Sequence, residues 1–182
     1  MSEEVLIRHC SPTLAGMKTG NMFSAAYTDE TELREDLRGF NRRFASKGLR
    51  IVPLRCRDNR ALLYLYRPKK LAQDLKHSTA QDVLKENGYP EHPGSCVSYL
   101  RGRMIGTGEF PHEVGLFLGY PPEDVCGFIT HGAADCKCVG CWKVYGDEAA
   151  AKKTFAKYKK CTAVYSAQWA NGKSIERLIV AD

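Results

Sequence analysis

The sequence predicts an α+β fold, with α/β as the alternative, in which a mixed β-sheet is covered by packed helices. Two observations carry this prediction. Residues 21–67 and residues 139–180 show the same order of strand, helix, strand and strand, so a β-α-β-β unit would be present twice. The intervening residues 68–131 are rich in helical patterns and turns. A chain of 182 residues, 43% of them hydrophobic, suffices for one well-buried domain over residues 1–182.

The first unit begins with a short strand at residues 21–27. Residues 30–46 then carry apolar side chains at the three-to-four spacing of an amphipathic helix, namely Leu33, Leu37, Phe40 and Phe44. Two strands, residues 49–55 and 61–67, follow on either side of an Asp-Asn turn. This order is typical of a helix followed by a β-hairpin.

The second unit is expected to repeat this order. A strand at residues 139–145 precedes a helix at residues 148–160. Strands at residues 162–168 and 174–180 then meet at an Asn-Gly turn, which favours a hairpin. Both units would contribute strands to one mixed sheet.

Four helices are predicted between the two units. Proline residues open several of them and glycine residues close them, as helix ends prefer. They span residues 69–86, 95–103, 112–118 and 122–131. The last two are close enough in the chain to form a tight helical hairpin.

Neither a targeting segment nor a membrane span is evident. The first ten residues lack the basic and apolar regions of a secretory signal, and every apolar run is far shorter than the roughly 20 residues that span a bilayer. We therefore expect a cytoplasmic protein with no membrane partner. In a reducing compartment the eight cysteines would be core thiols, metal ligands or redox groups rather than disulfides.

Positive charge is concentrated in two blocks of a chain whose net charge is +6. Residues 42–70 contain ten basic residues and one acidic residue, and residues 137–160 contain seven lysines and two acidic residues. If the two units pair in one sheet, these blocks form a shared face for an anionic ligand, an acidic protein or, less favoured, nucleic acid. The alternative is that both blocks are ordinary solvated helix ends.

A cysteine-rich segment is the strongest chemical motif. Its Cys-x-x-Cys pair, Cys138 and Cys141, can bind one metal ion or exchange as a dithiol. With Cys136 and the upstream Cys126 it supplies four thiols for zinc or for iron, as an iron–sulfur cluster or in a haem-related site, although the spacing matches no standard pattern. Buried reduced thiols are the alternative. The candidates for cofactor contact are the two residues that follow, Trp142 and Lys143.

His9 and Cys10 form a second candidate site, because a histidine beside a thiol can support nucleophilic chemistry. The alternative is a turn in which Ser11 caps a helix that begins at Pro12. The loop that follows ends like a phosphate-binding loop but lacks a glycine directly before Lys18, so no such loop is expected.

His112 and Glu113 form a third candidate site at the start of a predicted helix. They can act as an acid–base pair or as ligands. Alternatively, Glu113 only interacts with the helix dipole and His112 is a surface residue. The His-Glu-x-x-His zinc motif is not completed, so a zincin is excluded.

Three motifs in order, HCSPTLAG (9–16), FPHEVGLFLGYPPEDV (110–125) and CVGCWKVYGD (138–147), resemble a family of uncharacterised proteins from anaerobic Gram-positive bacteria. That family is known only as a domain of unknown function, and the resemblance covers nearly the whole chain. It implies a basic helix after the third motif and a closing strand at residues 174–178. It also implies that Cys138 and Cys141 are the central cysteines, that Cys136 is particular to this chain, and that an iron or redox role is favoured.

If the three motifs converge, their side chains line one pocket. We therefore expect a redox- or metal-linked protein that binds a small ligand or cofactor, with Cys138 and Cys141 as ligands or dithiol and Lys143 as their electrostatic support. The competing expectation is a non-catalytic binding module whose basic faces meet an acidic protein, such as a flavodoxin-like partner, or nucleic acid. The sequence leaves open whether the protein is an enzyme.

Overall fold

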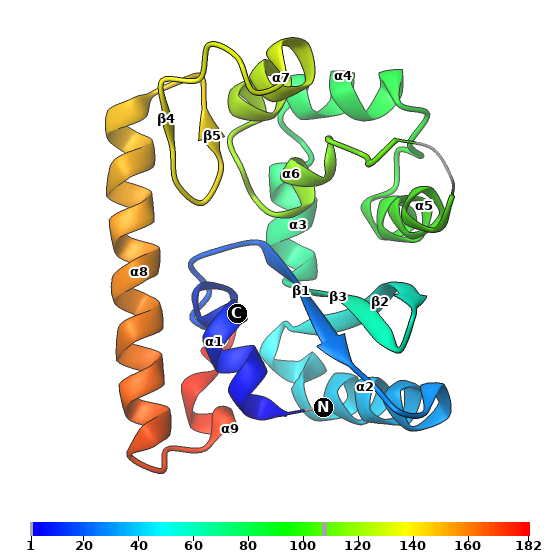
Figure 1. Ribbon diagram of the computed structural model, residues 1–182, viewed down its shortest axis with the longest axis vertical. Coiled ribbons are helices and arrows are strands. Elements are labelled where there is room, and N and C mark those ends of the chain that lie inside the picture. Colours follow the sequence, from blue (N-terminus) through cyan, green and yellow to red (C-terminus); the bar gives the residue numbers. More distant parts are fainter. Residues whose placement is uncertain (1, 107–108) are drawn as a thin grey trace.

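The computed structural model describes residues 2–106 and 109–182 and confirms the α+β class (Figure 1). The strands β1 (Gly20–Ala26), β2 (Arg50–Arg57) and β3 (Arg60–Tyr66) form one sheet in the order β1-β3-β2. Helix α2 (Glu30–Phe44) connects β1 to β2. The elements predicted for the first unit are therefore present, with strands that are antiparallel throughout instead of mixed.

Local chemistry explains both ends of this unit. The Asp29 side chain caps α2 by accepting hydrogen bonds from the backbone N–H groups of Thr31 and Glu32. Strand β2 turns into β3 at Asp58 and Asn59, whose φ values of 51° and 56° are those of a two-residue hairpin turn.

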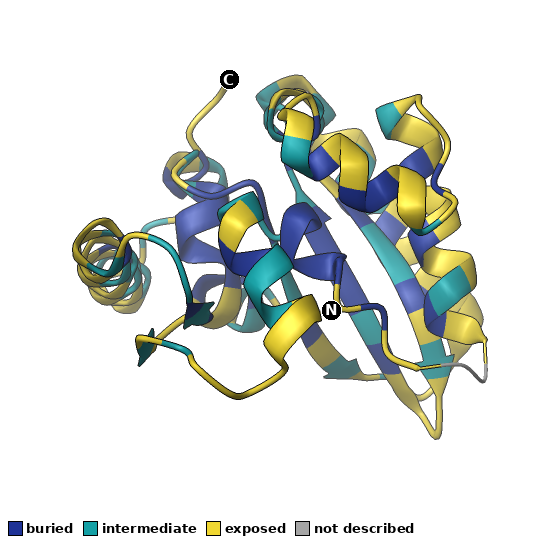
Figure 2. Ribbon diagram, turned by 90° about the horizontal axis from the view of Figure 1, so that it is seen from above, coloured by how far each residue is buried: buried dark blue, intermediate teal, exposed yellow. Residues whose placement is uncertain are grey.

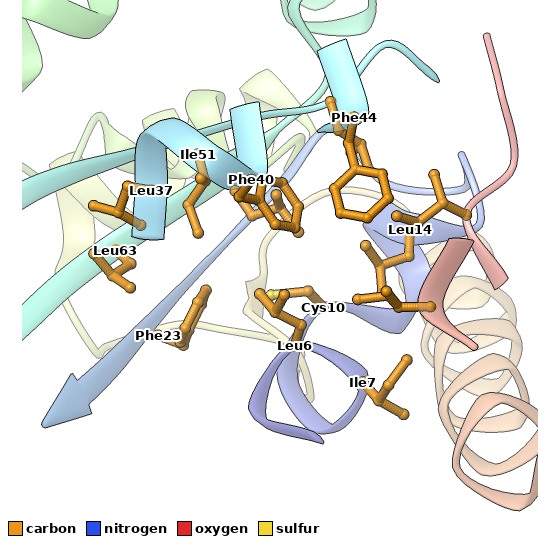
Figure 3. Packing of buried hydrophobic residues seen from close by; sticks show 14 of the residues in the cluster. Leu6, Ile7, Cys10, Leu14, Phe23, Leu37, Phe40, Phe44, Ile51 and Leu63 are labelled. Atoms are coloured by element: carbon orange, nitrogen blue, oxygen red, sulfur yellow. The ribbon is translucent and has the colours of Figure 1, made fainter. Parts of the chain in front are cut away.

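The central strand β3 contributes to two separate cores because its side chains alternate between the faces of the sheet. On one face, the buried residues Ala61, Leu63 and Leu65 pack with α1 (Glu3–Leu14) and α2. Figure 3 shows this core, in which Leu6 and Cys10 from α1 lie opposite Phe40 from α2. On the other face, Tyr64 belongs to a second core that the central helices complete.

The central helices cover this second face. The predicted helix at residues 69–86 is divided into α3 (Pro68–Asp74) and α4 (Ser78–Glu86), and α5 (Pro93–Ile105) follows. The short α6 (Val114–Phe117) and α7 (Pro122–His131) form the expected helical hairpin. Their buried side chains pack around Leu54 and Tyr64, so the sheet lies between two layers of helices.

The prediction of a second β-α-β-β unit is wrong. In place of a strand at 139–145, β4 (Cys138–Val139) and β5 (Lys143–Val144) form a small antiparallel hairpin. In place of strands at 162–168 and 174–180, the chain continues as one helix, α8 (Glu148–Ala170), and ends with the short α9 (Ile175–Leu178). The internal repeat is therefore absent, whereas the extent of a single domain over residues 1–182 stays a prediction.

The physical reason lies in the periodicity of α8. Neither proline nor glycine interrupts residues 148–170, and the apolar spacing of the first half continues into the second. Cys161 is buried, and Tyr165 and Trp169, four and eight residues further along, pack against the core beside α1. The strand propensity of residues 162–165 is thus overridden by packing along one helix face.

Helix α1 also corrects an expectation. Pro12 lies in its last turn and does not begin a helix. The Ser11 hydroxyl donates back to the carbonyl of Ile7 inside α1, so Ser11 is not a cap.

A buried arginine ties both ends of the chain to the sheet. Arg67, 1% exposed, follows β3 directly. Its guanidinium donates to the carbonyls of Thr13, Leu14 and Val180 at 2.7–2.8 Å and pairs with the carboxylate of Asp182. One side chain therefore satisfies carbonyls at the end of α1 and in the C-terminal segment.

Across residues 2–106 and 109–182, no helix is both long enough and apolar enough to cross a membrane.

Candidate functional site

An apolar pocket of about 350 Å³ lies between the α6–α7 hairpin and the β4–β5 hairpin. The two family-like motifs at 110–125 and 138–147 supply most of its walls. The expected site residues His112, Trp142 and Lys143 are among the lining side chains, so part of the expected convergence is present. The lining residues are Phe110, His112, Val114, Gly115, Tyr120, Asp124, Val125, Phe128, Trp142 and Lys143.

A buried carboxylate fixes the β4–β5 hairpin against α7. Asp124, 3% exposed, accepts a hydrogen bond from the Trp142 indole Nε1–H at 2.6 Å through Oδ2. Its Oδ1 accepts from the backbone N–H groups of Tyr145 and Gly146, both at 2.7 Å. Both carboxylate oxygens are engaged, and the indole is held in one orientation.

Aromatic rings surround Trp142 on more than one side. Tyr120 stacks on the indole with ring centroids 4.9 Å apart, and Phe155 from α8 meets it edge-on at 4.5 Å. Phe155 comes so close to Gly140 that an added Cβ there would lie 2.2 Å from its ring. The glycine of the Cys-x-x-Cys motif therefore allows the hairpin to approach α8.

Two basic side chains lie among the apolar walls. The His112 ring is 4.9 Å from the Phe128 ring in an edge arrangement. The Lys143 ammonium lies 5.3 Å from the centroid of the same ring. Within the described part of the chain Lys143 has no ion pair with a carboxylate.

Glu113 does not share this pocket with His112. It is 2% exposed, accepts a hydrogen bond from the Tyr89 hydroxyl at 2.8 Å and lies 3.1 Å from Nε of Arg103. Burial and the neighbouring Glu113 carboxylate raise the pKa of Tyr89. The two adjacent residues thus point to different surroundings, and Glu113 serves to join α5 to α6.

His9 and Cys10 also lie elsewhere. His9 is exposed on α1 and its ring is parallel to that of Phe23 at 6.1 Å. Cys10 is fully buried in the core of Figure 3, and burial raises the pKa of its thiol. This thiol is protonated at neutral pH, which is unfavourable for a nucleophile.

The expected metal ligands have separate neighbours. Cys138 lies beside Glu148, whereas Cys141 lies beside Lys18. Cys126 is near Glu123, and the Cys136 thiol faces the carbonyl of Ala133 at 3.7 Å. In the described ranges, no three His, Cys, Asp or Glu side chains form a metal-binding group, so the expected four-thiol set is not assembled.

Several residues of the pocket are not among the predicted site residues. Tyr120, Asp124 and Phe128 lie within or directly after the quoted motif FPHEVGLFLGYPPEDV. Their signal was an aromatic and an acidic residue beside a Tyr-Pro-Pro turn, but the partner of Asp124 is 18 residues away in the chain. Lys18, in the loop that lacks the glycine of a phosphate-binding loop, does not line this pocket and is likewise not among the predicted site residues.

The fold and site define a small α+β protein with an aromatic pocket edged by two basic side chains. The chain belongs to a family described as protein of unknown function (DUF3793), whose model matches residues 6–179. The predicted resemblance to a domain of unknown function is therefore confirmed. No curated protein and no solved structure matches the chain.

Proposed function

We propose that the protein binds a small, flat and largely apolar molecule that carries an acidic group, in the pocket between α6–α7 and β4–β5. One observation supports this most strongly: apolar walls surround two basic side chains, His112 and Lys143. Asp124 is the one acidic residue among the lining side chains, and both of its carboxylate oxygens are already engaged.

The apolar walls favour an aromatic ligand. A pocket of about 350 Å³ is at the lower end of the range of roughly 300–1,000 Å³ that small-molecule sites occupy. Each aromatic contact in such a pocket contributes about 0.5–1.5 kcal/mol beyond the burial of apolar area. The indole of Trp142 is fixed by Asp124 before any ligand arrives, so little ordering of this wall is needed on binding.

The basic side chains favour an acidic group on that ligand. Lys143 contacts the face of Phe128, a type of interaction that contributes about 0.5–1 kcal/mol at exposed sites. A charge-assisted hydrogen bond to a carboxylate or sulfonate is about twice as strong as a neutral one. The ammonium of Lys143 can therefore exchange its ring contact for the acid of a ligand.

This proposal keeps the small-ligand part of the expected function and sets aside its metal- and redox-linked part. The four cysteines expected to act together have different neighbours, and burial raises the pKa of Cys141 although Lys18 opposes the shift. A protonated Cys141 thiol is a weak metal ligand and a weak nucleophile.

The test of the proposal uses Trp142 as its reporter. Trp169→Phe leaves Trp142 as the single tryptophan of the chain, and we expect 8-anilinonaphthalene-1-sulfonate to quench its fluorescence with saturation. Phe128→Ala removes one aromatic wall and should weaken binding about fivefold, equivalent to about 1 kcal/mol. Val139→Ala, at an exposed site on the same hairpin, should bind normally. Absence of saturable quenching, or equal loss in both variants, would contradict the proposal.

A second candidate function is supported by the surface of α8, which stands at one edge of the molecule with its outer side exposed (Figure 2). The shared basic face expected from two paired units does not form, since the second unit is not a sheet. Instead Lys153, Lys157 and Lys160 lie at helical spacings of four and three on exposed positions, with no ion pair among the described residues. We propose an acidic protein partner for this face. Binding of this partner should weaken steeply between 50 and 200 mM salt, because salt screens the attraction between exposed charges. Binding of a ligand in the apolar pocket should depend on salt much less.

A further inference from the structure

A buried lysine, Lys18, is not among the residues that line the proposed pocket. Lys18 lies in the connection between α1 and β1 and is 5% exposed. Its backbone N–H donates to the carbonyl of Pro12 at 3.1 Å, which fixes the loop. Its ammonium lies 5.3 Å from the centroid of the Tyr120 ring, and Cys141 at the turn of the β4–β5 hairpin is close enough to act on its charge.

Lys18 is buried without a counter-charge. Within residues 2–106 and 109–182 its Nζ has neither an ion pair with a carboxylate nor a hydrogen bond. A buried ammonium in this condition is costly, and proteins normally pair such groups. Arg67, the other deeply buried cation described above, shows the usual solution, with four carbonyls and a carboxylate as partners.

The Nζ atom nevertheless reaches solvent. Every fully covered side-chain nitrogen or oxygen in the described part of the chain has a hydrogen-bond partner. Because Nζ of Lys18 has none, it must retain a small exposed surface. The amine is therefore in contact with solvent even though most of the Lys18 side chain is covered.

The surroundings suit a neutral amine better than a bound anion. The titratable groups that face Lys18 are Cys10 from α1, Cys141 from the hairpin and Tyr120 from the α6–α7 connection. Burial raises the pKa of all three, so each is uncharged at neutral pH. Anion sites are normally built from several N–H donors, and no second cation is among the groups that act on Lys18.

Burial lowers the pKa of Lys18 to about 8, although the two thiols oppose this shift. About a tenth of the side chains are then neutral at pH 7, compared with fewer than one in a thousand for an exposed lysine. Lysines desolvated in this way are the ones that serve proteins as amine nucleophiles.

We propose that Lys18 is a site of covalent imine formation with a small aldehyde or ketone. The neutral Nζ attacks the carbonyl carbon, a C–N bond forms, and the carbonyl oxygen gains a proton to give a carbinolamine. Loss of water then breaks the C–O bond and leaves a C=N bond, with both amine hydrogens departing in the water molecule. Neither an oxidant nor a reductant is required. The inference does not rest on the ligand proposed for the aromatic pocket.

The experiment traps the imine on the folded full-length chain. Acetaldehyde and sodium cyanoborohydride are added at pH 7, and the rate of ethylation of each lysine is followed by peptide mass mapping. We expect Lys18 to be modified at least about tenfold faster than the exposed Lys153, with a rate that saturates as acetaldehyde is raised. The rate at Lys18 should rise with pH to a plateau above about pH 8.

The controls separate reactivity from folding. In urea-unfolded protein the two lysines should react alike. Lys18→Arg should lose the fast site and leave the rates of the other lysines unchanged, and Lys143→Arg should retain the fast site. If Lys18→Arg does not fold, the wild-type comparison alone decides. Modification of Lys18 at or below the rate of Lys153, or a rate without saturation, would overturn the proposal.

Discussion

Removing one acceptor oxygen from Asp124 tests how the pocket is built. In Asp124→Asn, an amide nitrogen replaces one of the two carboxylate oxygens, and amide nitrogens cannot accept hydrogen bonds. Oδ1 bonds two backbone N–H groups, so we expect the remaining oxygen to stay there and the new NH2 to face the indole N–H of Trp142. Two donors would then oppose each other at a site that is 3% exposed.

The expected cost follows from these contacts. A hydrogen bond to a charged group contributes about 1.5–3 kcal/mol, and an unsatisfied buried donor costs about 1–3 kcal/mol. We therefore expect Asp124→Asn to lower the free energy of unfolding by about 3 kcal/mol, measured by urea denaturation followed by circular dichroism. Binding of the anilinonaphthalene probe should weaken as well, because Trp142 loses its fixed orientation.

A double-mutant cycle isolates the bond itself. Trp142→Phe removes the indole donor, so Asp124→Asn should cost about 1.5–3 kcal/mol less in that background than in the wild type. If the two substitutions are additive, or if Asp124→Asn alone costs less than about 0.5 kcal/mol, this carboxylate does not hold the pocket wall.

Three further predictions concern packing, the buried arginine and pH. Gly140→Ala should cost about 1–3 kcal/mol of stability because its Cβ would lie 2.2 Å from the Phe155 ring, whereas Gly102→Ala, in α5 with nothing within 4 Å, should be neutral or stabilising by up to about 1 kcal/mol in the same urea titrations. Arg67→Met removes the guanidinium that donates to four carbonyls and pairs with Asp182, and it should cost more than about 3 kcal/mol by thermal or urea unfolding, whereas Arg60→Met, at an exposed site, should stay within about 0.5 kcal/mol of wild type. Because the pKa of Lys18 falls from 10.5 to about 8 on folding, the unfolded chain binds more protons between these values. The stability of wild type relative to Lys18→Met should therefore be constant below pH 7 and rise by about 3 kcal/mol between pH 8 and 10.5, and a flat difference would show that Lys18 is not desolvated.

The first half of the fold was predictable because its signals are local. Leu33, Leu37, Phe40 and Phe44 lie at helical spacing and all four are buried. The Asp58-Asn59 turn fixes the hairpin within a few residues. In the second half, residues 162–165 have strand propensity, but Tyr165 and Trp169 pack along one face of α8 against the core beside α1. That contact joins segments about 150 residues apart, and no local pattern specifies it.

The candidate site was predictable in part. The motif residues His112, Trp142 and Lys143 share one pocket, although Cys138 lies beside Glu148 and Cys141 lies beside Lys18. The direction of a side chain on a two-residue strand depends on the hairpin register, which the Cys-x-x-Cys spacing does not determine. The roles of Asp124 and Lys18 depend on burial, which only the tertiary structure reveals.

The most direct measurement compares the affinity of Lys143→Met for two probes of similar shape. One is the anionic 8-anilinonaphthalene-1-sulfonate and the other is the neutral N-phenyl-1-naphthylamine, each titrated into wild type and variant, with Lys153→Met as the control for overall charge. If the pocket binds an apolar acid, Lys143→Met weakens the anionic probe about tenfold, equivalent to about 1.4 kcal/mol, and leaves the neutral probe unchanged. Equal affinities of Lys143→Met and wild type for both probes, or the same loss in Lys153→Met, would contradict this function for the pocket.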